Sequence, residues 1–480
     1  MTGETEGGLD GNGSTASRPR RSIPAMHDPL AYAASNVPAF ERALFEFVAI
    51  PSISAQPDHA AHVARSAEWL RARMEHAGLA ARVVSAPGQH PLVIGRSKPV
   101  AGAPTVLVYG HHDVQPVDPL SEWDYPPFEP TVVDGVLRCR GGADDKGPTL
   151  AMVCAAEAWN RGGGGLPVNV VFAVEGEEES GGHHLADFIR AHPDELRADC
   201  LVILDVAGFA AGVPALCYGL RGIQTLELRV EGPSRDLHSG GYGGAVANPA
   251  EIVARLVASC RNADGSIAIP GVLDDVATPD AAERARMDSL PVDEEEFRAE
   301  SGAPRLFGEP GRGLYERLWA RPTVEVNGIF GGYQGVGSKT IIPAWAGAKL
   351  SLRLVPKQDP AKVFAAVKRH FEKLCPPTVK LTITPGHGAA ALLNPPSGPW
   401  AAKAEKAMAD AYGVAPKFVR AGGSIPIAQV FHDVLGLPPL LFGTYSPGER
   451  AHAPNERYPI ADFHSAVRCG VRFFGLAAER

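Results

Sequence analysis

The stretch TVLVYGHHDVQP at residues 105–116 joins a short apolar run to a cluster of polar side chains. The apolar run is typical of a strand that is buried on both faces of a sheet. Further runs of this kind follow it, separated by segments whose pattern favours helices. The expected strands and helices, in chain order, are Thr105–Tyr109, Lys146–Trp159, Pro167–Val174, His184–Ala191 and Cys200–Leu204. Their alternation predicts an α/β fold in which a large domain holds a mainly parallel sheet with helices on both faces.

The pattern changes near Ala215, where a second arrangement of strands and helices begins. The expected elements are strand Gln224–Val230, helix Ala250–Cys260, strands Thr323–Asn327 and Lys349–Leu354, helix Ala361–Leu374 and strand Val379–Thr384. This β-α-β-β-α-β order is that of a ferredoxin-like unit, and the acidic, Ala-rich stretch Asp274–Arg312 is expected to be an insertion within it. We therefore predict a small domain at residues 216–388, inserted into a larger domain at residues 26–215 and 389–480. Residues 1–25, rich in Gly, Ser and Thr, are expected to be a disordered tail.

The composition argues against several classes of protein. Apolar residues make up 45% and charged residues 21% of the 480-residue chain, as in soluble globular proteins of more than one domain. A net charge of −8 argues against nucleic acid or a membrane surface as the main partner, and no apolar run approaches the ~18 residues of a membrane span. The seven scattered cysteines form no C-x-x-C pair. This favours buried thiols in a reducing, cytoplasmic compartment over disulfides or thiolate-bound zinc.

Four clusters of acidic or histidine residues stand at strand ends or helix starts. They are His111–Asp113, Asp144–Lys146, Glu177–Glu179 and Asp205. Three of them follow predicted strands, and the ligand sites of parallel sheets lie beyond the carboxyl ends of the strands. Carboxylates gathered there repel one another, so a divalent metal ion would supply the missing positive charge. Histidine with several carboxylates and no thiolate suits Zn²⁺ or Mn²⁺.

Such a cluster can hydrolyse an amide bond. One carboxylate can bridge two metal ions about 3.5–4 Å apart, and the pair lowers the pKa of a shared water molecule. A carboxylate that is not a ligand can take the proton of this water and pass it to the leaving group. Glu178 and Glu179 are adjacent, so one of them can face the metal ions while the other faces the substrate.

Each cluster taken alone has an ordinary explanation. A His-x-Asp sequence is more often a solvated loop, an acidic triplet is usually the start of a solvated helix, and Asp145 with Lys146 can be a surface ion pair. The joint occurrence of the clusters, mostly at strand ends, favours a metal site. Residues 332–340 resemble a P-loop, but Ser338 separates the glycine from the lysine. Residues 386–391 resemble a dinucleotide-binding loop, but two prolines follow where a helix should begin.

The clusters belong to a longer series of motifs. The series comprises GHHDVQP (residues 110–116), RGGADDKGP (140–148), EGEEESGG (175–182), RDLHSGGYGG (235–244), GSKTIIP (337–343), RLVP (353–356), GHG (386–388) and RAGGSIP (420–426). It resembles the di-zinc metallopeptidase family of aminoacylases, glutamate carboxypeptidases and carnosine-type dipeptidases. The resemblance covers nearly the whole chain after the expected tail, and it is strongest to the cytosolic non-specific dipeptidase, or carnosinase-like, branch.

The resemblance implies two divalent metal ions per subunit, zinc ions with manganese or cobalt as substitutes. His111 and Asp205 would hold one ion, and Glu179 and His452 would hold the other. Asp144 would bridge both ions. His452 stands alone in its part of the sequence, so its spacing by itself indicates no metal site.

The resemblance also implies roles for residues that are not ligands. Glu178 would be the catalytic general base, and Asp113 would support His111 from the side away from the metal ion. The peptide bond between Asp144 and Asp145 would be cis.

In the family that this sequence resembles, the inserted domain is a lid and a dimerisation unit, which implies a homodimer. His238 would cross from one subunit to the site of the other and stabilise the developing oxyanion. Arg353, Thr340, His387 and Ser424 would contact the substrate. Arg353 is suited to a carboxylate, which a guanidinium can grip with two parallel hydrogen bonds.

Two positions depart from the dipeptidase branch, Ala421 where an acidic residue is usual and Ala207 where a Tyr is usual. Both positions are tied there to the amino-terminal side of the substrate, so a strict preference for free-amine dipeptides is in doubt. The expected activity is metal-dependent hydrolysis of dipeptides or similar small amides with a free carboxylate. An N-acyl-amino-acid deacylase or a glutamate-type carboxypeptidase with the same chemistry is the alternative. A non-catalytic metal- or peptide-binding relative is a more remote one.

Overall fold

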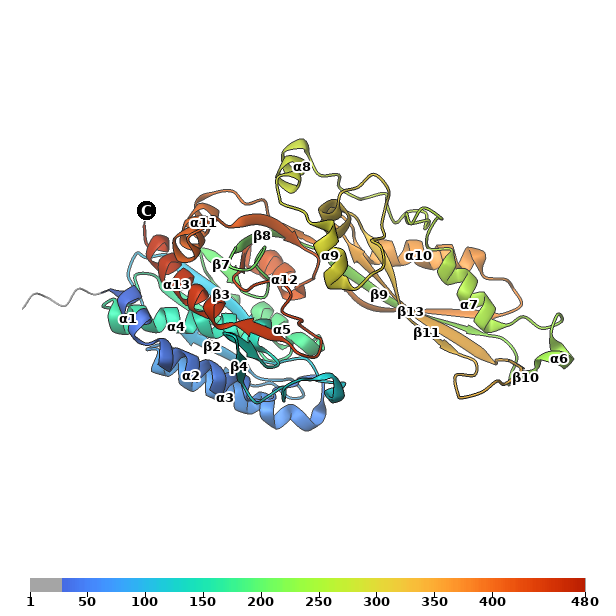
Figure 1. The fold of residues 1–480 in the computed structure, drawn as a ribbon, viewed down its shortest axis with the longest axis horizontal. Coiled ribbons are helices and arrows are strands. Elements are labelled where there is room, and N and C mark those ends of the chain that lie inside the picture. Colours follow the sequence, from blue (N-terminus) through green and yellow to red (C-terminus); the bar gives the residue numbers. More distant parts are fainter. Residues whose placement is uncertain (1–27, 480) are drawn as a thin grey trace, which may run out of the picture.

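The chain builds two main sheets that lie in separate lobes of an elongated molecule (Figure 1). The structure, a computed structural model, describes residues 28–479. The tail expected at residues 1–25 therefore lies outside the described residues. The larger lobe holds a nine-stranded sheet and the smaller lobe a four-stranded sheet.

The nine-stranded sheet has four parallel strands at its centre. Its strands run in the order β1-β2-β6-β3-β7-β17-β8-β15, and β16 pairs with β8. Strands β6, β3, β7 and β17 are parallel neighbours, and antiparallel pairs extend the sheet on both sides. The strands are β1 (Ala80–Val84), β2 (Leu92–Arg96), β3 (Thr105–His111), β6 (Asn169–Glu175), β7 (Cys200–Ile203), β8 (Ala215–Leu220), β15 (Leu392–Leu393), β16 (Lys417–Ala421) and β17 (Pro439–Gly443). The expected parallel core of the sheet is confirmed.

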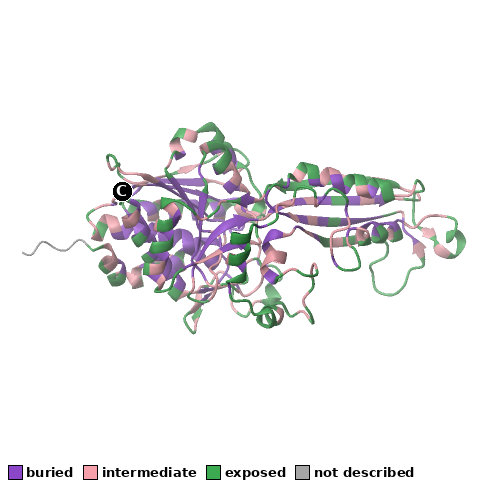
Figure 2. Cartoon of the chain, turned by 90° about the horizontal axis from the view of Figure 1, so that it is seen from above, coloured by how far each residue is buried: buried purple, intermediate pink, exposed green. Residues whose placement is uncertain are grey.

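The central strands are apolar because helices cover both faces of this sheet (Figure 2). In β3, Val106 and Val108 enter one hydrophobic cluster, and Leu107 and Tyr109 enter the cluster on the opposite face. A strand buried on both faces is apolar at every position rather than at every second one. The first cluster packs against α1 (Pro29–Ser35), α2 (Val37–Val48), α3 (Ala60–His76), α4 (Gly147–Gly162), α11 (Pro399–Tyr412) and α13 (Ile460–Ala477), and the second against α5 (His184–Ala191) and α12 (Pro426–Leu435).

The four-stranded sheet is antiparallel and buries one face. Its strands lie in the order β11-β13-β9-β14, and the chain order is β9-α7-β11-β13-α10-β14. The elements are β9 (Gly222–Glu231), α7 (Pro249–Ala258), β11 (Thr323–Gly331), β13 (Trp345–Leu354), α10 (Pro360–Leu374) and β14 (Lys380–Ala389). Leu226, Leu228 and Val230 alternate along β9 and pack against α7 and α10, as the period of a half-buried strand requires.

Smaller sheets complete the fold. β10 (Leu237–His238) pairs with β12 (Ile341–Ile342) beside α6 (Ser239–Tyr242), at the end of the small lobe that is far from the nine-stranded sheet (Figure 1). In the larger lobe, β4 (Thr131–Val133), β5 (Val136–Arg138) and β18 (Arg457–Pro459) form a three-stranded sheet.

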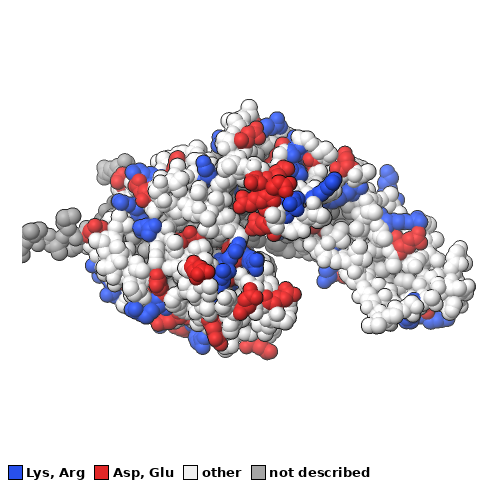
Figure 3. Space-filling view, viewed as in Figure 1, with Lys and Arg blue, Asp and Glu red and all other residues white. Residues whose placement is uncertain are grey.

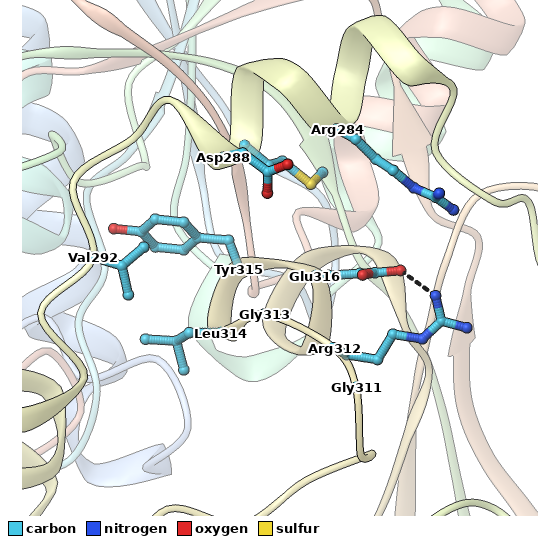
Figure 4. Close-up of a pocket in the computed structure, with 10 residues that line it drawn as sticks. Arg284, Asp288, Val292, Gly311, Arg312, Gly313, Leu314, Tyr315 and Glu316 are labelled. Atoms are coloured by element: carbon cyan, nitrogen blue, oxygen red, sulfur yellow. Dashed lines mark hydrogen bonds and ion pairs between the residues drawn. The ribbon is translucent and has the colours of Figure 1, made fainter.

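The segment between α7 and β11 belongs to the small lobe in chain order but packs against the larger lobe. It contains α8 (Ala281–Asp288) and α9 (Glu294–Ser301), and α9 carries an acidic surface (Figure 3). The segment lies in the chain between elements of the small unit, where the sequence predicted an insertion. Its Met287 and Leu290, however, are buried in the cluster of the larger sheet. Glu283 also forms a buried ion pair with Arg420 of β16. Apolar and ionic contacts therefore fix this segment to the larger lobe, where it encloses a cavity of about 420 Å³ lined by Arg312 and Glu316 among others (Figure 4).

The chain passes from one sheet to the other later than the boundary expected at 215/216. β8 begins at Ala215 and continues to Leu220, and it pairs with β17 and β16 of the larger sheet. Only Arg221 separates β8 from β9. On the return, β14 ends at Ala389, next to the expected boundary at 388/389.

All seven cysteines lie within the described part of the chain and carry free thiols, in agreement with their spacing. Within residues 28–479, no helix combines the length and the apolar character that a membrane crossing requires.

Candidate metal centre and active site

The predicted ligands meet at the carboxyl edge of the parallel strands. His111 is the last residue of β3, Glu179 lies in the turn after β6, and Asp205 follows β7. Because β6, β3 and β7 are parallel neighbours, residues at their carboxyl ends reach the same edge of the sheet. Asp144 comes from the turn before α4, and His452 comes from the loop between β17 and β18.

Asp144 lies between two histidines that are far apart in the sequence. Its Oδ1 is 3.0 Å from His111 Nε2, and its Oδ2 is 3.1 Å from His452 Nε2. His452 Nε2 is also 3.3 Å from Glu179 Oε2. Ligand atoms of His111, Asp144 and Glu179 all lie within 4.8 Å of one another. A carboxylate that turns one oxygen toward each of two imidazoles has the geometry of a bridging ligand between two cations.

The cluster strongly attracts positive charge. The hydrogen bonds that His452 makes to Asp144 and Glu179 raise its pKa to about 10. Burial, and then the charge of Asp144, raise the pKa of Asp205 well above its usual range. Burial raises the pKa of Glu178 to about 8, and the charge of Glu179 adds to this effect. Carboxylates held this close in a low-dielectric site are stabilised by a divalent cation, and the imidazole and carboxylate donors present suit zinc or manganese.

Asp113 orients His111 for this role. His111 Nδ1 lies 3.1 Å from the backbone carbonyl of Asp113 and 3.5 Å from its Oδ1. Asp113 Oδ2 accepts hydrogen bonds from the Ser54 hydroxyl at 2.6 Å and the Glu179 amide at 3.1 Å. Burial opposes ionisation of Asp113, but the hydrogen bonds from His111 and Ser54 lower its pKa. An acceptor at Nδ1, here the Asp113 carbonyl, fixes the imidazole ring so that Nε2 faces the other ligands.

Sequence reasoning missed Glu456, which is fully buried beside the turn that carries Asp144. Glu456 Oε2 accepts from Arg140 Nη1 at 2.8 Å and from the Gly141 amide at 2.9 Å. Its Oε1 accepts from the Ala143 amide at 3.0 Å. The Asp144–Asp145 peptide bond in this turn is cis, as the resemblance implied. The only sequence signal was an acidic residue shortly after His452, and that signal does not reveal burial.

Of the predicted substrate contacts, His387 lies near Glu178, the predicted general base, and Arg353 and Ser424 contact each other. His387 and Glu178 line one cavity of about 350 Å³, together with Pro426 at the start of α12. Burial, and then the charge of His183, lower the pKa of His387, so its ring is neutral at neutral pH. Arg353 Nη1 donates to Ser424 Oγ at 2.9 Å. Ser424 stands two residues before Pro426 in the chain.

The structure does not bring His238 and Thr340 to the metal cluster within one chain. His238 pairs with Ile341 in the β10–β12 ribbon, and the Thr340 carbonyl accepts from the Ser239 amide. Both residues are exposed. The ribbon lies at the far end of the small lobe (Figure 1).

Comparisons with known proteins identify the family of the chain. The sequence profile of peptidase family M20/M25/M40 matches residues 107–475. The chain is 34% identical to the Cys-Gly metallodipeptidase dug1 of Schizosaccharomyces pombe, over 89% of this chain and 93% of that protein. It is 30% identical to the Beta-Ala-His dipeptidase of Homo sapiens, over 91% and 89%.

Solved structures give the same relationship. The dipeptidase Dug1p of Saccharomyces cerevisiae matches with a TM-score of 0.84 and 30% identity, over 95% of this chain and 99% of that one. The M20 family metallo-carboxypeptidase Sso-CP2 of Sulfolobus solfataricus matches with a TM-score of 0.83 and 31% identity, over 92% and 99%. Fold and ligand cluster together define a metallopeptidase. Because the family profile covers most of its length, the chain belongs to peptidase family M20/M25/M40.

Proposed function

We propose that the protein hydrolyses the amide bond of dipeptides, or of similar small amides with a free carboxylate. The observation that carries this proposal is the position of Asp144 between His111 and His452, with Glu178 beside the same cluster. Two relatives are named a Cys-Gly metallodipeptidase and a Beta-Ala-His dipeptidase, which supports a dipeptide as substrate.

Two divalent ions per subunit would be held by the ligands at the sheet edge, zinc with manganese or cobalt as substitutes. His111 and Asp205 would bind one ion, Glu179 and His452 the other, and Asp144 both. When bound, such ions lower the pKa of a water molecule and polarise the amide carbonyl. The close approach of the three ligand atoms of His111, Asp144 and Glu179 supports this assignment.

Glu178 is the general base of the proposed reaction. It accepts a proton from the attacking water and donates it to the nitrogen of the leaving amine. Burial raises the pKa of Glu178 to about 8, and bound cations would lower it again, so the carboxylate could take the proton and later return it. Asp113 keeps His111 oriented, and His387 and Ser424 contact the substrate.

The small lobe is the proposed lid and dimerisation domain, with a ferredoxin-like order of elements. It would run from the end of β8 to the end of β14, and the two remaining segments would form the catalytic domain. In a homodimer, His238 and Thr340 of one subunit would reach the active site of the other, which agrees with their exposure at the far end of the lobe. Seven free thiols support action in the cytoplasm.

A second candidate function uses the same chemistry on another substrate. Ala421 and Ala207 offer no charged or hydroxyl group to a free amine, which favours an N-acyl-amino-acid deacylase or a glutamate-type carboxypeptidase as the alternative. The similarity to a metallo-carboxypeptidase supports the second of these. A non-catalytic metal- or peptide-binding relative is the remote alternative, and the presence of Glu178 argues against it.

The test is an assay of the metal-analysed protein on matched free and N-acylated dipeptides, with zinc, manganese or cobalt. We expect hydrolysis of free dipeptides, and a loss of about 10²–10⁴-fold in Glu178→Gln at unchanged metal content. The exposed Glu405→Gln is the matched control. Near-normal turnover by Glu178→Gln would refute its role as base, and preferential cleavage of acylated substrates would favour the deacylase. Absence of hydrolysis across the panel would leave only the binding relative.

A further inference from the structure

Five arginines line a cavity of about 320 Å³ where the two lobes meet. They are Arg221, Arg261, Arg317, Arg321 and Arg353. Three of them have a carboxylate partner: Arg261 pairs with Glu325 at 3.1 Å, Arg317 with Glu294 at 2.9 Å, and Arg321 with Glu309 at 2.6 Å. Within residues 28–479, neither Arg221 nor Arg353 forms an ion pair with a carboxylate. Glu325 also lines the cavity and partly offsets the charge of Arg221, but neither arginine has a carboxylate of the described chain within ion-pair distance.

These two arginines are neighbours across adjacent strands. Arg221 directly precedes Gly222, which pairs with Leu354, and Arg353 pairs with Ile223. Burial, and then the positive charge of Arg353, lower the pKa of Arg221 to about 10. Two like charges in a partly buried cavity are unfavourable until an anion joins them.

The contacts that the two guanidinium groups make are to neutral groups. Arg221 Nε donates to the Gly422 carbonyl at 3.0 Å, and Arg353 Nη1 donates to Ser424 Oγ at 2.9 Å. Arg221 Nη1 is buried, and no acceptor within the described chain bonds to it. A buried donor that lacks an acceptor costs about 1–3 kcal/mol, and a bound carboxylate would supply the missing acceptor.

The loop that these arginines contact leads to the active site. It runs from Gly422 to Pro426, and Pro426 lines the cavity that contains Glu178 and His387. The loop thus contacts the arginines at Gly422 and Ser424 and lines the cavity of Glu178 at Pro426. A carboxylate has two oxygens and about four lone-pair directions, so it can accept from two guanidinium groups at once.

We infer that Arg221 is a second substrate-binding arginine, and that Arg221 and Arg353 together hold the free carboxylate of the substrate. This inference rests on the proposed function, because it names how the carboxylate end of the amide is recognised. It assigns to Arg221 a binding role in addition to its contact with the glycine loop.

The experiment compares each dipeptide with its carboxamide, using Arg221→Met, Arg221→Lys and the control Arg317→Met. Arg317 lines the same cavity but has Glu294 as its partner. We expect Arg221→Met to raise KM for the free-carboxylate substrate about ten-fold or more, with a smaller change in kcat. The preference of Arg221→Met for the carboxylate over the carboxamide substrate should fall in proportion. Arg221→Lys should retain part of this preference. Arg317→Met should behave as wild type. An equal loss on both substrates would show that Arg221 only positions the loop, and would overturn the inference.

A binding measurement separates this inference from the proposed function. Calorimetry with leucine and leucinamide on the metal-loaded protein needs no turnover. Wild type should bind leucine more tightly than leucinamide, and Arg221→Met should lose this difference at unchanged circular dichroism and metal content. If wild type hydrolyses no amide but shows the difference, only the proposed function fails. If Arg221→Met keeps the difference, the inference fails whatever the activity.

Discussion

Arg140 and Glu456 form a buried ion pair, with 2.8 Å between Nη1 and Oε2, that joins the two loops carrying Asp144 and His452. The second terminal nitrogen of Arg140 donates to the carbonyl of Ala453, next to His452, and to the carbonyl of Pro116 after β3. The pair therefore connects three segments that carry metal ligands. Its geometry holds the distances between these ligands before any metal ion binds.

Replacement of Glu456 should weaken metal binding. Glu456→Gln keeps the size of the side chain but removes the charge that faces Arg140 and the Gly141 and Ala143 amides. Loss of a partner that orients ligands typically costs 10–100-fold in metal affinity, and we expect a decrease of about that size. Competitive metal titration measures it, with the exposed Glu405→Gln as control. Unchanged affinity in Glu456→Gln would contradict the role of the ion pair.

Removal of metal should lower stability as well as activity. Without a metal ion, only protons can offset the charge of the clustered carboxylates, which is why the pKa values of Asp205 and His452 are raised. A ligand present at 1,000 times its Kd stabilises a protein by about 4 kcal/mol, so chelation should reduce Tm, and added zinc, manganese or cobalt should restore it. Glu179→Gln should show a smaller metal-dependent shift. A Tm that does not respond to chelator would argue against a resident metal site.

Stability should decrease below pH 6.5 because of His112. Its ring is buried, Nε2 lies 3.0 Å from the Pro91 carbonyl, and burial lowers its pKa to about 4. The unfolded chain binds a proton near pH 6.5 and the folded chain only near pH 4, so unfolding takes up a proton between these values. The resulting loss is at most about 3 kcal/mol by pH 4.

Denaturant unfolding between pH 4 and 7.5 measures the contribution of His112. His112→Gln can still donate to Pro91 and cannot be protonated, so it should show a weaker pH dependence than wild type. The exposed His432→Gln serves as the control. Parallel pH profiles for wild type and His112→Gln would contradict this assignment.

Mixed dimers test the contribution of His238 from a second subunit. His238→Ala and Glu178→Gln should each be nearly inactive as homodimers. When the two are co-expressed with different tags, the heterodimer has one complete site, because one subunit supplies Glu178 and the other supplies His238. Purified heterodimers should thus regain activity at one of two sites. Heterodimers without activity would count against action in trans.

Three central strands of the larger sheet, and the polar residues that follow them, could be predicted because both depend on local sequence. The apolar runs at residues 105–109, 167–174 and 200–204 became β3, β6 and β7, since a strand covered on both faces needs apolar residues at every position. His111, Glu179 and Asp205 follow these strands, and parallel strands place such residues at one edge. In the small lobe the signal was different: strand β9 alternates buried with more exposed residues, as a half-buried strand does.

Other features depend on segments that are distant in the chain. The sequence predicted an insertion at residues 274–312 but not where it packs. Met287 of this segment packs against the larger sheet, a contact between distant parts of the chain. That Arg221 has no carboxylate partner within residues 28–479 is another such feature. Its neighbours come from β13 and from the loop after β16.

The sequence by itself determined which residue types stand at the strand ends, and through the series of motifs it determined the family. Only the tertiary structure decided that Asp144 lies between His111 and His452, that Glu456 is buried against Arg140, and that His238 stays far from the cluster of its own chain. The physical reason is that hydrophobic periodicity is read within a few residues, whereas ion pairing and burial depend on how segments hundreds of residues apart pack together.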